Sequence, residues 1–535
     1  MIPLHVHSNN TFLNGTIPIG NLIARCIEYG IESTAMTDDN TMHGVIEFSK
    51  LAIEKNIKPI IGSRIDSIAN EKEYVILLAK NNKGYSELCK IITSRKLNDD
   101  FSIKQILKRK LNNLIILTPS IELLGDISPS DNIYVELIAS INEKRLNRIR
   151  YQFADANGFK CVVTNPIYYL DENDFLLHKT LTAIRLRTNI DNLNPEDLAD
   201  EEFYFKNPKL IEKEWRSLPE VLQNSDLIGS QCNVDLKLSK YKFPVYSIPA
   251  KISADTFLWN ESFKGLAKRF KVVPEQAMKR LEMELSVISD MGFSNYFLIV
   301  WDIVNEAKRR GMITIGRGSA ANSLVAFCLE ITQIDPLKHN LYFERFLNKA
   351  RSSPPDFDID FSWKERDEII KYIFEKYGYE NVAMISTTVT FRARSAFREV
   401  AKAFGITNEE ISRFSRKIPW TDAANLPHLA ELFPESKGLN FNQEPWKTIV
   451  EIASKIARFP RHISIHPGGI VITPTNITDY VALEYAKNKG LGLIVTQPDM
   501  YSIEDLGLIK IDILSQRSLG VLRDTMASIK KEKYI

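Results

Sequence analysis

Pro355-Asp356-Phe357-Asp358-Ile359-Asp360-Phe361 alternates acidic and large apolar residues without a break. Successive side chains of a β-strand point to opposite faces, so the segment predicts a strand with three aspartates on one face and apolar residues on the other. Carboxylates two residues apart lie about 7 Å from each other, and such crowding of like charge requires a cation. A pair of divalent metal ions would meet that requirement, as in phosphoryl and nucleotidyl transfer. An exposed edge strand with solvated acids is the alternative.

A second acidic strand is predicted at Leu508-Ile509-Lys510-Ile511-Asp512-Ile513-Leu514. Asp512 and Lys510 share one face, and isoleucines occupy the other. A carboxylate in so apolar a strand is costly to bury unless it meets a metal or a cation. We therefore expect Asp512 to join Asp358 and Asp360 from an adjacent strand, with a surface pairing to Lys510 as the alternative.

Residues 312–325 read as a strand, a glycine turn and a helix, with the turn at Gly316-Arg317-Gly318-Ser319. Glycines let backbone N–H groups approach an anion, and the start of a helix adds partial positive charge. Arg317 and Ser319 could donate to a phosphate. The turn lacks the spacing of a P-loop or a dinucleotide fingerprint, so a plain tight turn is the alternative.

Basic residues recur through residues 391–460, which we expect to be mostly helical. They are Arg392, Arg394, Arg398, Arg413, Arg416, Lys417 and Arg458, followed by Arg461. Neutralisation of phosphates makes such clusters useful, although a charge run is more often a solvated helix face. Arg394 and Arg398, four residues apart, are the preferred phosphate contacts. The segment Arg461–Gly469, with His462 and His466, could grip a nucleic-acid backbone or simply form a Gly-Gly turn.

Length and composition indicate several domains and no large charge excess. A chain of 535 residues is too long for one core and suggests three or four domains. Lys and Arg number 69 against 67 Asp and Glu, so any nucleic-acid surface has to be a local patch. Five scattered cysteines fit a reducing cytoplasm better than disulfides or a zinc knuckle. The sequence shows no signal-peptide pattern and no apolar run of about 18 residues, so we expect a cytoplasmic location and no membrane span.

Residues 1–170 alternate short apolar strands with helices. Strands are predicted at 32–37, 58–62, 112–118, 132–137 and 159–164, and helices at 19–28 and 44–55. This alternation predicts a parallel sheet or barrel. Residues 236–253 read as a linker, followed by helices at 275–290, 297–310 and 364–377 and a strand at 469–473.

These motifs, together with Glu344-Arg345-Phe346-Leu347-Asn348, follow one another in the order of the bacterial C-family DNA polymerases. The whole chain resembles the N-terminal half of that family, the DNA polymerase III α subunits and their error-prone relatives. The resemblance implies that Asp358, Asp360 and Asp512 are palm carboxylates that bind two Mg²⁺ ions; Asp356 is not carried over as a ligand. It implies triphosphate contacts from Gly316, Arg317, Gly318, Ser319, Arg345, Lys510 and Arg394, and DNA contacts from Arg398, Arg461, His462 and His466.

The implied fold is a multidomain α/β and α+β protein. A distorted β/α barrel of the polymerase-and-histidinol-phosphatase (PHP) type is followed by a nucleotidyltransferase-like palm with an inserted helical thumb. The expected domains are the PHP-like domain 1–240, the palm 241–390 and 467–525, the thumb 391–466, and the start of the fingers at 526–535. The implied partners are primer-template DNA, a dNTP, a C-terminal polymerase half, a sliding clamp and other replisome subunits. We expect the chain to be a truncation, a split-gene half or a degraded product, and we expect little or no activity from the isolated chain without fingers.

The N-terminal part resembles a PHP domain that has lost ligands. His5 and His7 share a strand face, as a metal site needs, and Asp38, Asp39 and His43 follow in family positions. An intact PHP domain carries up to three metals for phosphoester hydrolysis. Here Asp39 stands for a family His, Arg64 for an acid, Asn165-Pro166-Ile167-Tyr168 for Asn-Asp-x-His, and Asn14 where an acid is frequent.

An internal cation such as Arg64 can replace a metal while keeping the electrostatics of the lost site. We therefore hypothesise a scaffold without exonuclease activity, in which His5 and His7 could bind one metal at most. Two alternatives stay open: a PHP-type metallophosphoesterase or 3′-5′ exonuclease, and a non-catalytic DNA-binding subunit.

Overall fold

In a computed structural model the chain forms two compact units, and residues 1–248, 252–349, 355–486 and 494–532 are described. The first unit comprises Met1–Leu236, Thr387–Ser464 and Val481–Gly490. The second comprises Lys237–Ser386, Ile465–Tyr480 and Leu491–Ile535. Two expected features fall partly outside the described residues: the linker, at 249–251, and the start of the fingers, at 533–535.

The first unit is built on a six-stranded sheet whose strands follow in sequence order. They are β1 (Ser33–Met36), β2 (Lys58–Asp66), β3 (Tyr74–Ala79), β4 (Leu114–Thr118), β5 (Ile133–Ile138) and β6 (Lys160–Thr164). β1–β2, β4–β5 and β5–β6 pair in parallel, as predicted. β3 was absent from the predicted strands and runs antiparallel to both of its neighbours. A polar turn, closed by the Ser67 N–H donating to Glu73 O at 2.9 Å, reverses the chain before it.

Residues 3–7 close this sheet into a barrel. The Ala35 N–H donates to Pro3 O at 2.8 Å on one side, and the His7 N–H donates to Ile167 O at 2.8 Å on the other. This places His5 and His7 on the closing segment, whose apolar neighbours Leu4 and Val6 are fully buried. The expected distorted β/α barrel is thereby confirmed.

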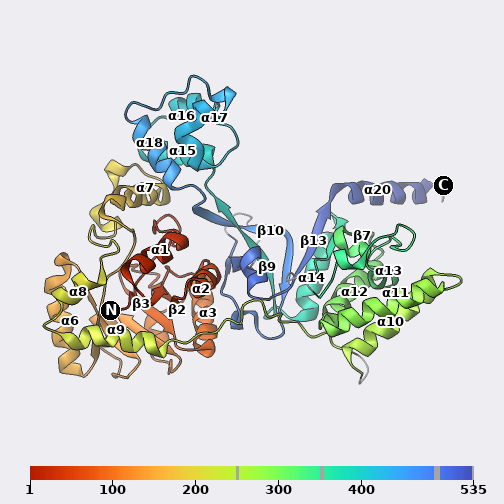
Figure 1. Ribbon diagram of the computed structural model, residues 1–535, viewed down its shortest axis with the longest axis horizontal. Helices are drawn as coiled ribbons and strands as arrows, with labels where there is room; N and C mark the ends of the chain where they lie inside the picture. The colour runs from red at the N-terminus through yellow and green to blue at the C-terminus, as the bar shows by residue number, and fades with distance from the viewer. Residues whose placement is uncertain (249–251, 350–354, 487–493, 533–535) are drawn as a thin grey trace. The chain divides into compact units, whose positions relative to one another are not determined.

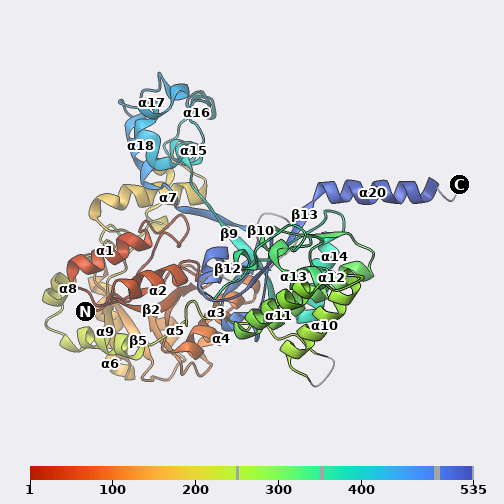
Figure 2. The same ribbon diagram turned by 45° about the vertical axis from the view of Figure 1, so that its right-hand side comes forward.

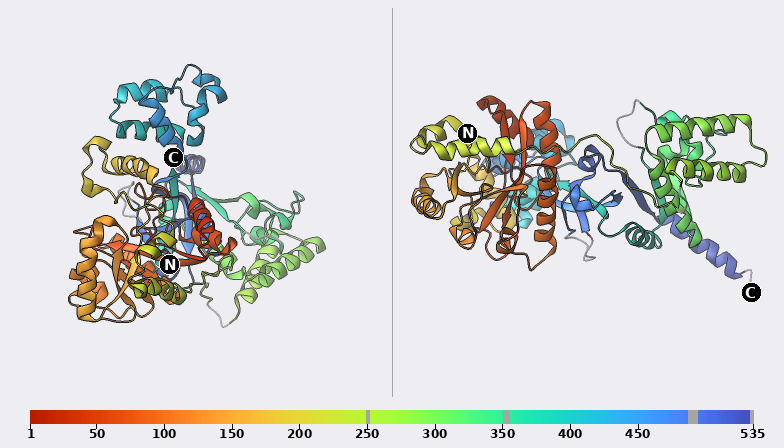
Figure 3. Two further views of the ribbon diagram at one scale, coloured as in Figure 1. Left: turned by 60° about the vertical axis from the view of Figure 1, so that its left-hand side comes forward. Right: turned by 90° about the horizontal axis from the view of Figure 1, so that it is seen from below.

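Helices pack around the barrel (Figures 1 and 3). They are α1 (Ile19–Tyr29), α2 (Val45–Glu54), α3 (Asn82–Leu97), α4 (Ile103–Leu107), α5 (Ile121–Leu124), α6 (Lys144–Asn157), α7 (Phe175–Leu186), α8 (Pro208–Glu214) and α9 (Pro219–Gln231). α1 buries Leu22 and Cys26 on one face and ends at Gly30, whose φ of 67° favours glycine.

A helical insertion also belongs to the first unit. It consists of α15 (Ala393–Ala403), α16 (Asn408–Ser415), α17 (Leu429–Leu432) and α18 (Trp446–Lys455), so the predicted helical content is confirmed. Phe397 and Val400 of α15 and Ile449 of α18 share one core with Leu177 and Leu181 of α7. Burial of each such side chain stabilises the fold by about 1.5–3 kcal/mol, and this shared core anchors the insertion on α7.

A seven-stranded sheet has the strand order β11 (Leu483–Tyr485), β12 (Ile494–Asp499), β9 (Val382–Thr390), β10 (Pro460–Ile472), β13 (Lys510–Gln516), β8 (Asp358–Ser362) and β7 (Thr314–Arg317). The second unit contains β12, β13, β8 and β7, together with β9 as far as Ser386 and β10 from Ile465. β13 and β8 are parallel, with Asp512 opposite Asp358. β7 lies antiparallel on the other side of β8, with Arg317 opposite Asp358. The two acidic segments and the glycine turn are therefore neighbours in one sheet.

Helices gather beside this sheet, as α10–α13 show in Figure 2. They are α10 (Ala254–Arg269), α11 (Glu275–Asp290), α12 (Ser294–Arg309), α13 (Leu324–Cys328), α14 (Arg366–Tyr377), α19 (Met500–Asp505) and α20 (Arg517–Glu532). Phe357, Ile359 and Phe361 are fully buried, so the apolar face predicted for the aspartate segment is confirmed. The Phe357 ring lies 5.1 Å from the ring of Phe297 in α12.

Within the described ranges, no single helix is long and apolar enough to cross a membrane. α11 and α12 reach that threshold only when taken together, as a pair bent by 114°.

Candidate active site

Three carboxylates meet where β8 and β13 lie side by side. One oxygen each of Asp356, Asp358 and Asp512 lies within 4.8 Å of the others, and no other group of three potential ligands comes as close within the described ranges. Asp512 is 5% exposed, and its Oδ1 accepts no hydrogen bond from the described part of the chain. An orphaned buried carboxylate oxygen is costly, and so is repulsion among three acids. A divalent cation held by these oxygens would offset both costs, so the residues fit such an ion.

Lys510 supplies one positive charge to this cluster. Its Nζ donates to Asp512 Oδ2 at 2.8 Å and lies 3.6 Å from Asp356 Oδ2. The pKa of Asp356 is raised to about 6, chiefly by burial and also by the charges of Asp512 and Asp358, which act against the opposing charge of Lys510. Burial and the Asp512 charge also raise the pKa of Asp358. One ammonium group is therefore insufficient for the three carboxylates.

Gly318 brings the glycine turn against Asp358. Its φ is 71°, a conformation that side chains rarely adopt, and an added Cβ would lie 3.1 Å from Asp358 Oδ2. Only glycine combines this backbone geometry with so close an approach. The turn backbone, which is expected to bind phosphate, therefore lies directly against Asp358, which is expected to bind metal.

Asp360 lies apart from the three grouped carboxylates. Its Oδ1 accepts from Gln516 Nε2 at 3.3 Å and lies 3.6 Å from Arg317 Nε. These two partners hold the Asp360 carboxylate away from the group, since spacing along the strand alone would separate Asp356 from Asp358 just as far. The role of Asp360 as a ligand stays a prediction, and Asp356, which the resemblance left aside, is the nearer carboxylate. Alternation along a strand marks all three acids equally and cannot distinguish them.

Four of the residues expected to contact phosphate, Gly316 to Ser319, belong to the predicted turn itself, and Arg345 lies in the short helix Phe343–Arg345. Arg317, Gly318 and Arg345 are exposed, and Ser319 is half-buried. An added Cβ on Gly316 would lie 2.2 Å from the Ile331 carbonyl oxygen, so no larger residue fits at this position while the Ile331 backbone packs against it.

Four expected phosphate or DNA contacts lie in the first unit. Arg394 donates to Ile418 O at 2.6 Å, and Arg398 donates to Ser415 Oγ at 3.1 Å. Arg461 donates to Glu399 Oε1 at 2.8 Å, and burial lowers the pKa of neighbouring His462. The three arginines hold the helical insertion together, and contact with DNA stays a prediction for all four residues.

His466 lies in the second unit beside Asp512. Its Nδ1 accepts N–H groups from Gly469 at 2.6 Å and Gly468 at 3.3 Å, and it lies 3.7 Å from Asp512 Oδ1. Burial lowers the pKa of His466. A neutral ring therefore holds the Gly468-Gly469 backbone next to the carboxylates. The Gly-Gly turn considered from the sequence is wrong, because both glycines lie within β10 and Gly469 pairs with Asp512 of β13. Contact with DNA stays a prediction.

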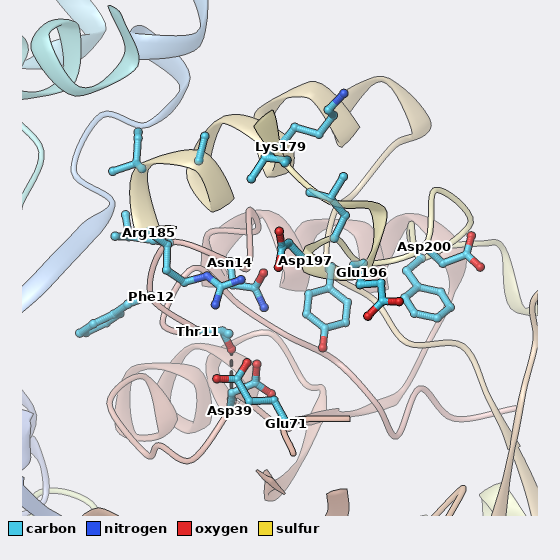
Figure 4. Close-up of a pocket in the computed structure, with 18 of the residues that line it drawn as sticks. Thr11, Phe12, Asn14, Asp39, Glu71, Lys179, Arg185, Glu196, Asp197 and Asp200 are labelled. Atoms are coloured by element: carbon cyan, nitrogen blue, oxygen red, sulfur yellow. Dashed lines mark hydrogen bonds between the residues drawn. The ribbon is translucent and has the colours of Figure 1, made fainter. Parts of the chain in front are cut away.

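The first unit contains a cavity of about 2230 Å³ at the mouth of the barrel. His5, Asp39, Arg64, Tyr74 and Tyr168 line its barrel side. Figure 4 shows Arg185 reaching from α7 toward Asn14, with Asp39 and Glu71 on the opposite side.

Arg64 occupies the barrel position where a metal ligand was expected. Its Nη1 lies 3.0 Å from Asp39 Oδ1 and 3.9 Å from Asp66 Oδ2, and its guanidinium lies 4.2 Å from the Tyr74 ring centroid. Tyr168 stacks on His7 with 4.0 Å between ring centroids. An arginine and a tyrosine thus fill the space around the first histidines.

The remaining residues expected at this site also have protein partners. Asp38 accepts from the Ser8 N–H at 2.6 Å and from Thr11 Oγ1 at 2.7 Å. His43 stacks on Phe12, and its Nε2 lies 3.7 Å from Glu484 Oε2.

The histidines themselves retain free nitrogens. His5 Nδ1 lies 2.8 Å from Glu136 Oε1, whereas the buried Nε2 atoms of His5 and His7 have no hydrogen-bond partner among the described residues. Two imidazoles could hold one ion, but Asp38 accepts hydrogen bonds from Ser8 and Thr11. Asp39 lies 3.6 Å from His7 Nδ1, and its same oxygen is paired with Arg64 at 3.0 Å. The residues therefore do not fit a multinuclear metal centre.

Comparisons with known proteins identify two matching regions. Residues 3–154 match the family model for the PHP domain, and residues 256–515 match the model for the bacterial DNA polymerase III alpha NTPase domain. An error-prone DNA polymerase of Symbiobacterium thermophilum is 32% identical, with 100% of this chain and 52% of that protein covered. The DNA polymerase III subunit alpha of Bacillus subtilis is 34% identical (100% and 50% covered), and that of Buchnera aphidicola is also 34% identical (97% and 48% covered). The chain spans about half the length of the curated relatives that it matches.

Proposed function

This chain belongs to the family of bacterial DNA polymerase III alpha subunits and their error-prone relatives, and we propose that it carries the nucleotidyl-transfer site of a template-directed DNA polymerase. The observation that supports this most is the pairing of Asp512 with Asp358, which groups three carboxylates within 4.8 Å beside Gly318. Phosphoryl transfer needs positioning and charge neutralisation, and this site offers carboxylates for metal beside a turn for phosphate.

In the proposed reaction the primer 3′-oxygen bonds to the α-phosphorus of a dNTP as the bond to pyrophosphate breaks, and the hydroxyl proton is lost to water. Two Mg²⁺ ions, when bound, would supply Lewis-acid activation of the hydroxyl and neutralise the departing pyrophosphate. Asp358 and Asp512 would hold them, with Asp356 as the nearest further acid and Asp360, two residues along β8, as the third ligand that the family resemblance implies. The backbone at Gly318 and the hydroxyl of Ser319 would donate to the triphosphate.

Basic side chains of the second unit would complete the triphosphate site. Arg317 and Arg345 are exposed and would bind phosphate oxygens as planar donors. Lys510 now donates to Asp512 at 2.8 Å, and it would turn to a phosphate once a metal neutralises that carboxylate.

The proposal extends to the domains. We assign residues 241–390 and 467–525 to the palm, 391–466 to a DNA-binding thumb, 526–535 to the start of the fingers, and 1–240 to a PHP-like scaffold. The pairing of Arg64 with Asp39 supports a scaffold over a phosphoesterase, because it occupies an expected ligand. Primer-template DNA, a C-terminal polymerase half and replisome proteins would be the partners, in the cytoplasm.

Primer extension tests the function. The chain is incubated with primer-template, dNTPs and Mg²⁺, alone and with the C-terminal half of a relative. We expect extension only in the mixture, and its loss in Asp358→Asn and in Asp512→Asn. Asp290→Asn is the matched control, since Asp290 is an exposed acid of the same unit that pairs with Lys349 at 2.8 Å. Extension that persists in an Asp358→Asn/Asp512→Asn double variant would refute the proposal.

A further inference from the structure

Glu284 is a fully buried carboxylate on the apolar face of α11. It shares that face with Leu281, Leu285 and Ile288, and all four side chains are 0% exposed. Carboxylates are rarely buried unless they are paired and hydrogen-bonded. The sequence contains a signal for this residue: Glu284 falls at the same helical spacing as the core residues of α11, and an acid at such a position predicts a specific buried partner.

The partners of Glu284 lie on α11 and immediately after the glycine turn. Its Oε1 accepts from Arg280 Nε at 2.6 Å. Its Oε2 accepts from Ser323 Oγ at 2.9 Å and from the Val325 N–H at 3.1 Å. Glu284 therefore fixes the junction between the turn Gly318–Asn322 and α13.

Arg280 extends the same network to two further backbone segments. Its Nη2 donates to Asn322 O and to Leu341 O, each at 3.2 Å. Asn322 in turn donates from Nδ2 to Ser319 O at 2.9 Å. Leu341 precedes the short turn Phe343–Arg345. One ion pair, in which Glu284 is fully buried and Arg280 is 18% exposed, thus connects the segments that carry Ser319 and Arg345.

We propose that the Arg280–Glu284 pair positions the triphosphate-binding turn, an inference that rests on the proposed function. A buried ion pair adds little net stability compared with apolar residues of similar size, so stability alone gives a weak reason for it here. Its hydrogen bonds instead hold a turn whose glycine at φ 71° is intrinsically flexible. A displacement of about 1 Å in a positioning element can reduce rates by about 100-fold. Both residues are positioning residues, because neither lies at the carboxylates.

Two variants separate the charge of the pair from its geometry. Glu284→Gln keeps an acceptor for Ser323 and Val325 but removes the charge opposite Arg280. Arg280→Lys keeps the charge but loses the planar fork that reaches Asn322 and Leu341. Glu306→Gln in α12 is the matched control, because Glu306 pairs with Arg310 at four-residue spacing and the same 2.6 Å, away from the turn.

The experiment measures two affinities of the full chain: that for Mn²⁺ alone, by paramagnetic resonance, and that for Mg²⁺·dATP, by calorimetry. We expect the Kd for Mg²⁺·dATP to rise about tenfold or more in Glu284→Gln and in Arg280→Lys, which is about 1.4 kcal/mol. The Kd for Mn²⁺ should stay within about twofold, and Glu306→Gln should change neither. Loss of both affinities would indicate a merely structural role and overturn the inference.

Failure of the inference can be told apart from failure of the function. If the native chain binds Mg²⁺·dATP, Asp358→Asn abolishes binding and the two pair variants bind normally, the positioning role is wrong and the proposed site stands. If the native chain binds no Mg²⁺·dATP, the proposed site is wrong and the inference is overturned with it.

Discussion

Asp512 on β13 and Asp358 on β8 occupy matching positions in a parallel strand pair, so their carboxylates leave the sheet on the same face. Parallel strands need a long crossover between them, and here the intervening chain includes the whole helical insertion. The acids that form the candidate metal site are therefore remote in sequence, and only the sheet brings them together. A shift of one residue in this pairing would turn Asp512 to the opposite, apolar face.

Gly318→Ala should impair binding at the site beyond its effect on stability. A Cβ at a positive φ costs about 1–2 kcal/mol, and at this position it would also press on Asp358 Oδ2 from 3.1 Å. We expect weaker binding of both Mn²⁺ and Mg²⁺·dATP. Gly311→Ala is the matched control, because Gly311 has φ 73° and its added Cβ would meet no described atom within 4 Å. If Gly318→Ala and Gly311→Ala lose the same stability and bind Mn²⁺ and Mg²⁺·dATP equally well, the close approach of Gly318 to Asp358 has no role in binding.

Lys510→Met should change two affinities in opposite directions. The Lys510 ammonium lies 2.8 Å from Asp512 Oδ2 and competes with a cation for that oxygen. Its removal should tighten Mn²⁺ binding several-fold, up to about tenfold. The affinity for Mg²⁺·dATP should fall, because a phosphate contact is lost. A parallel fall in both affinities would instead mean that Lys510 serves to orient Asp512.

Arg64→Met should destabilise the barrel by about 3–5 kcal/mol, because it leaves Asp39 partly buried without its cation. The double variant Arg64→Met/Asp39→Asn should recover at least about 1 kcal/mol of that loss, as expected for residues in contact. Lys72→Met, which removes an exposed pair with Glu196 at 3.2 Å, should change stability by less than about 1 kcal/mol.

The same measurements test for a structural metal in the barrel. A chelator should leave the urea midpoint of the first unit unchanged, since Arg64 supplies the positive charge. A drop in that midpoint on addition of a chelator would argue against replacement of the metal by Arg64. So would stability losses of Arg64→Met and Asp39→Asn that simply add in the double variant.

His178 should make the first unit sensitive to acid. Its ring donates from Nδ1 to Asn14 O at 2.9 Å and accepts the Ala199 N–H at Nε2 at 3.0 Å, so it is held neutral. Burial lowers its pKa from 6.5 to about 4. The unfolded chain therefore binds a proton between pH 6.5 and about 4 where the folded chain does not, and stability falls as pH falls through that window.

The size of this effect follows from the width of the window. About 1.5 kcal/mol should be lost between pH 6.5 and pH 5, because the full slope of about 1.36 kcal/mol per pH unit is reached only below pH 6. His178→Gln can donate to Asn14 and accept from Ala199 without titrating, so urea unfolding at the two pH values should show a smaller loss in this variant. An equal loss in both proteins would show that other groups carry the acid sensitivity.

Periodic segments were predictable from the sequence, whereas contacts between remote segments were not. The helix Glu275–Asp290 follows the prediction because its apolar spacing is strong. β3 was missed because Tyr74–Ala79 is a continuous apolar run, which gives no alternation to separate a strand from a buried helix. Alternation marked Asp356, Asp358 and Asp360 equally, and only the register with β13 distinguishes them.

Side-chain partners account for the other gaps. The replacement of a PHP ligand by Arg64 could be anticipated from the family pattern, but its contact with Asp39 needed the fold. Arg394 and Arg398 were expected at phosphate because of their charge, and their hydrogen bonds to Ile418 and Ser415 are set by packing within the helical insertion.

Anomalous diffraction from crystals of the chain grown with Mn²⁺ and a non-hydrolysable dNTP tests the central claim most directly. We predict a manganese peak bonded to both Asp358 and Asp512, with triphosphate oxygens against the backbone of Gly318 and Ser319. Manganese bound only in the barrel, or a triphosphate bound away from these two aspartates, would contradict the account.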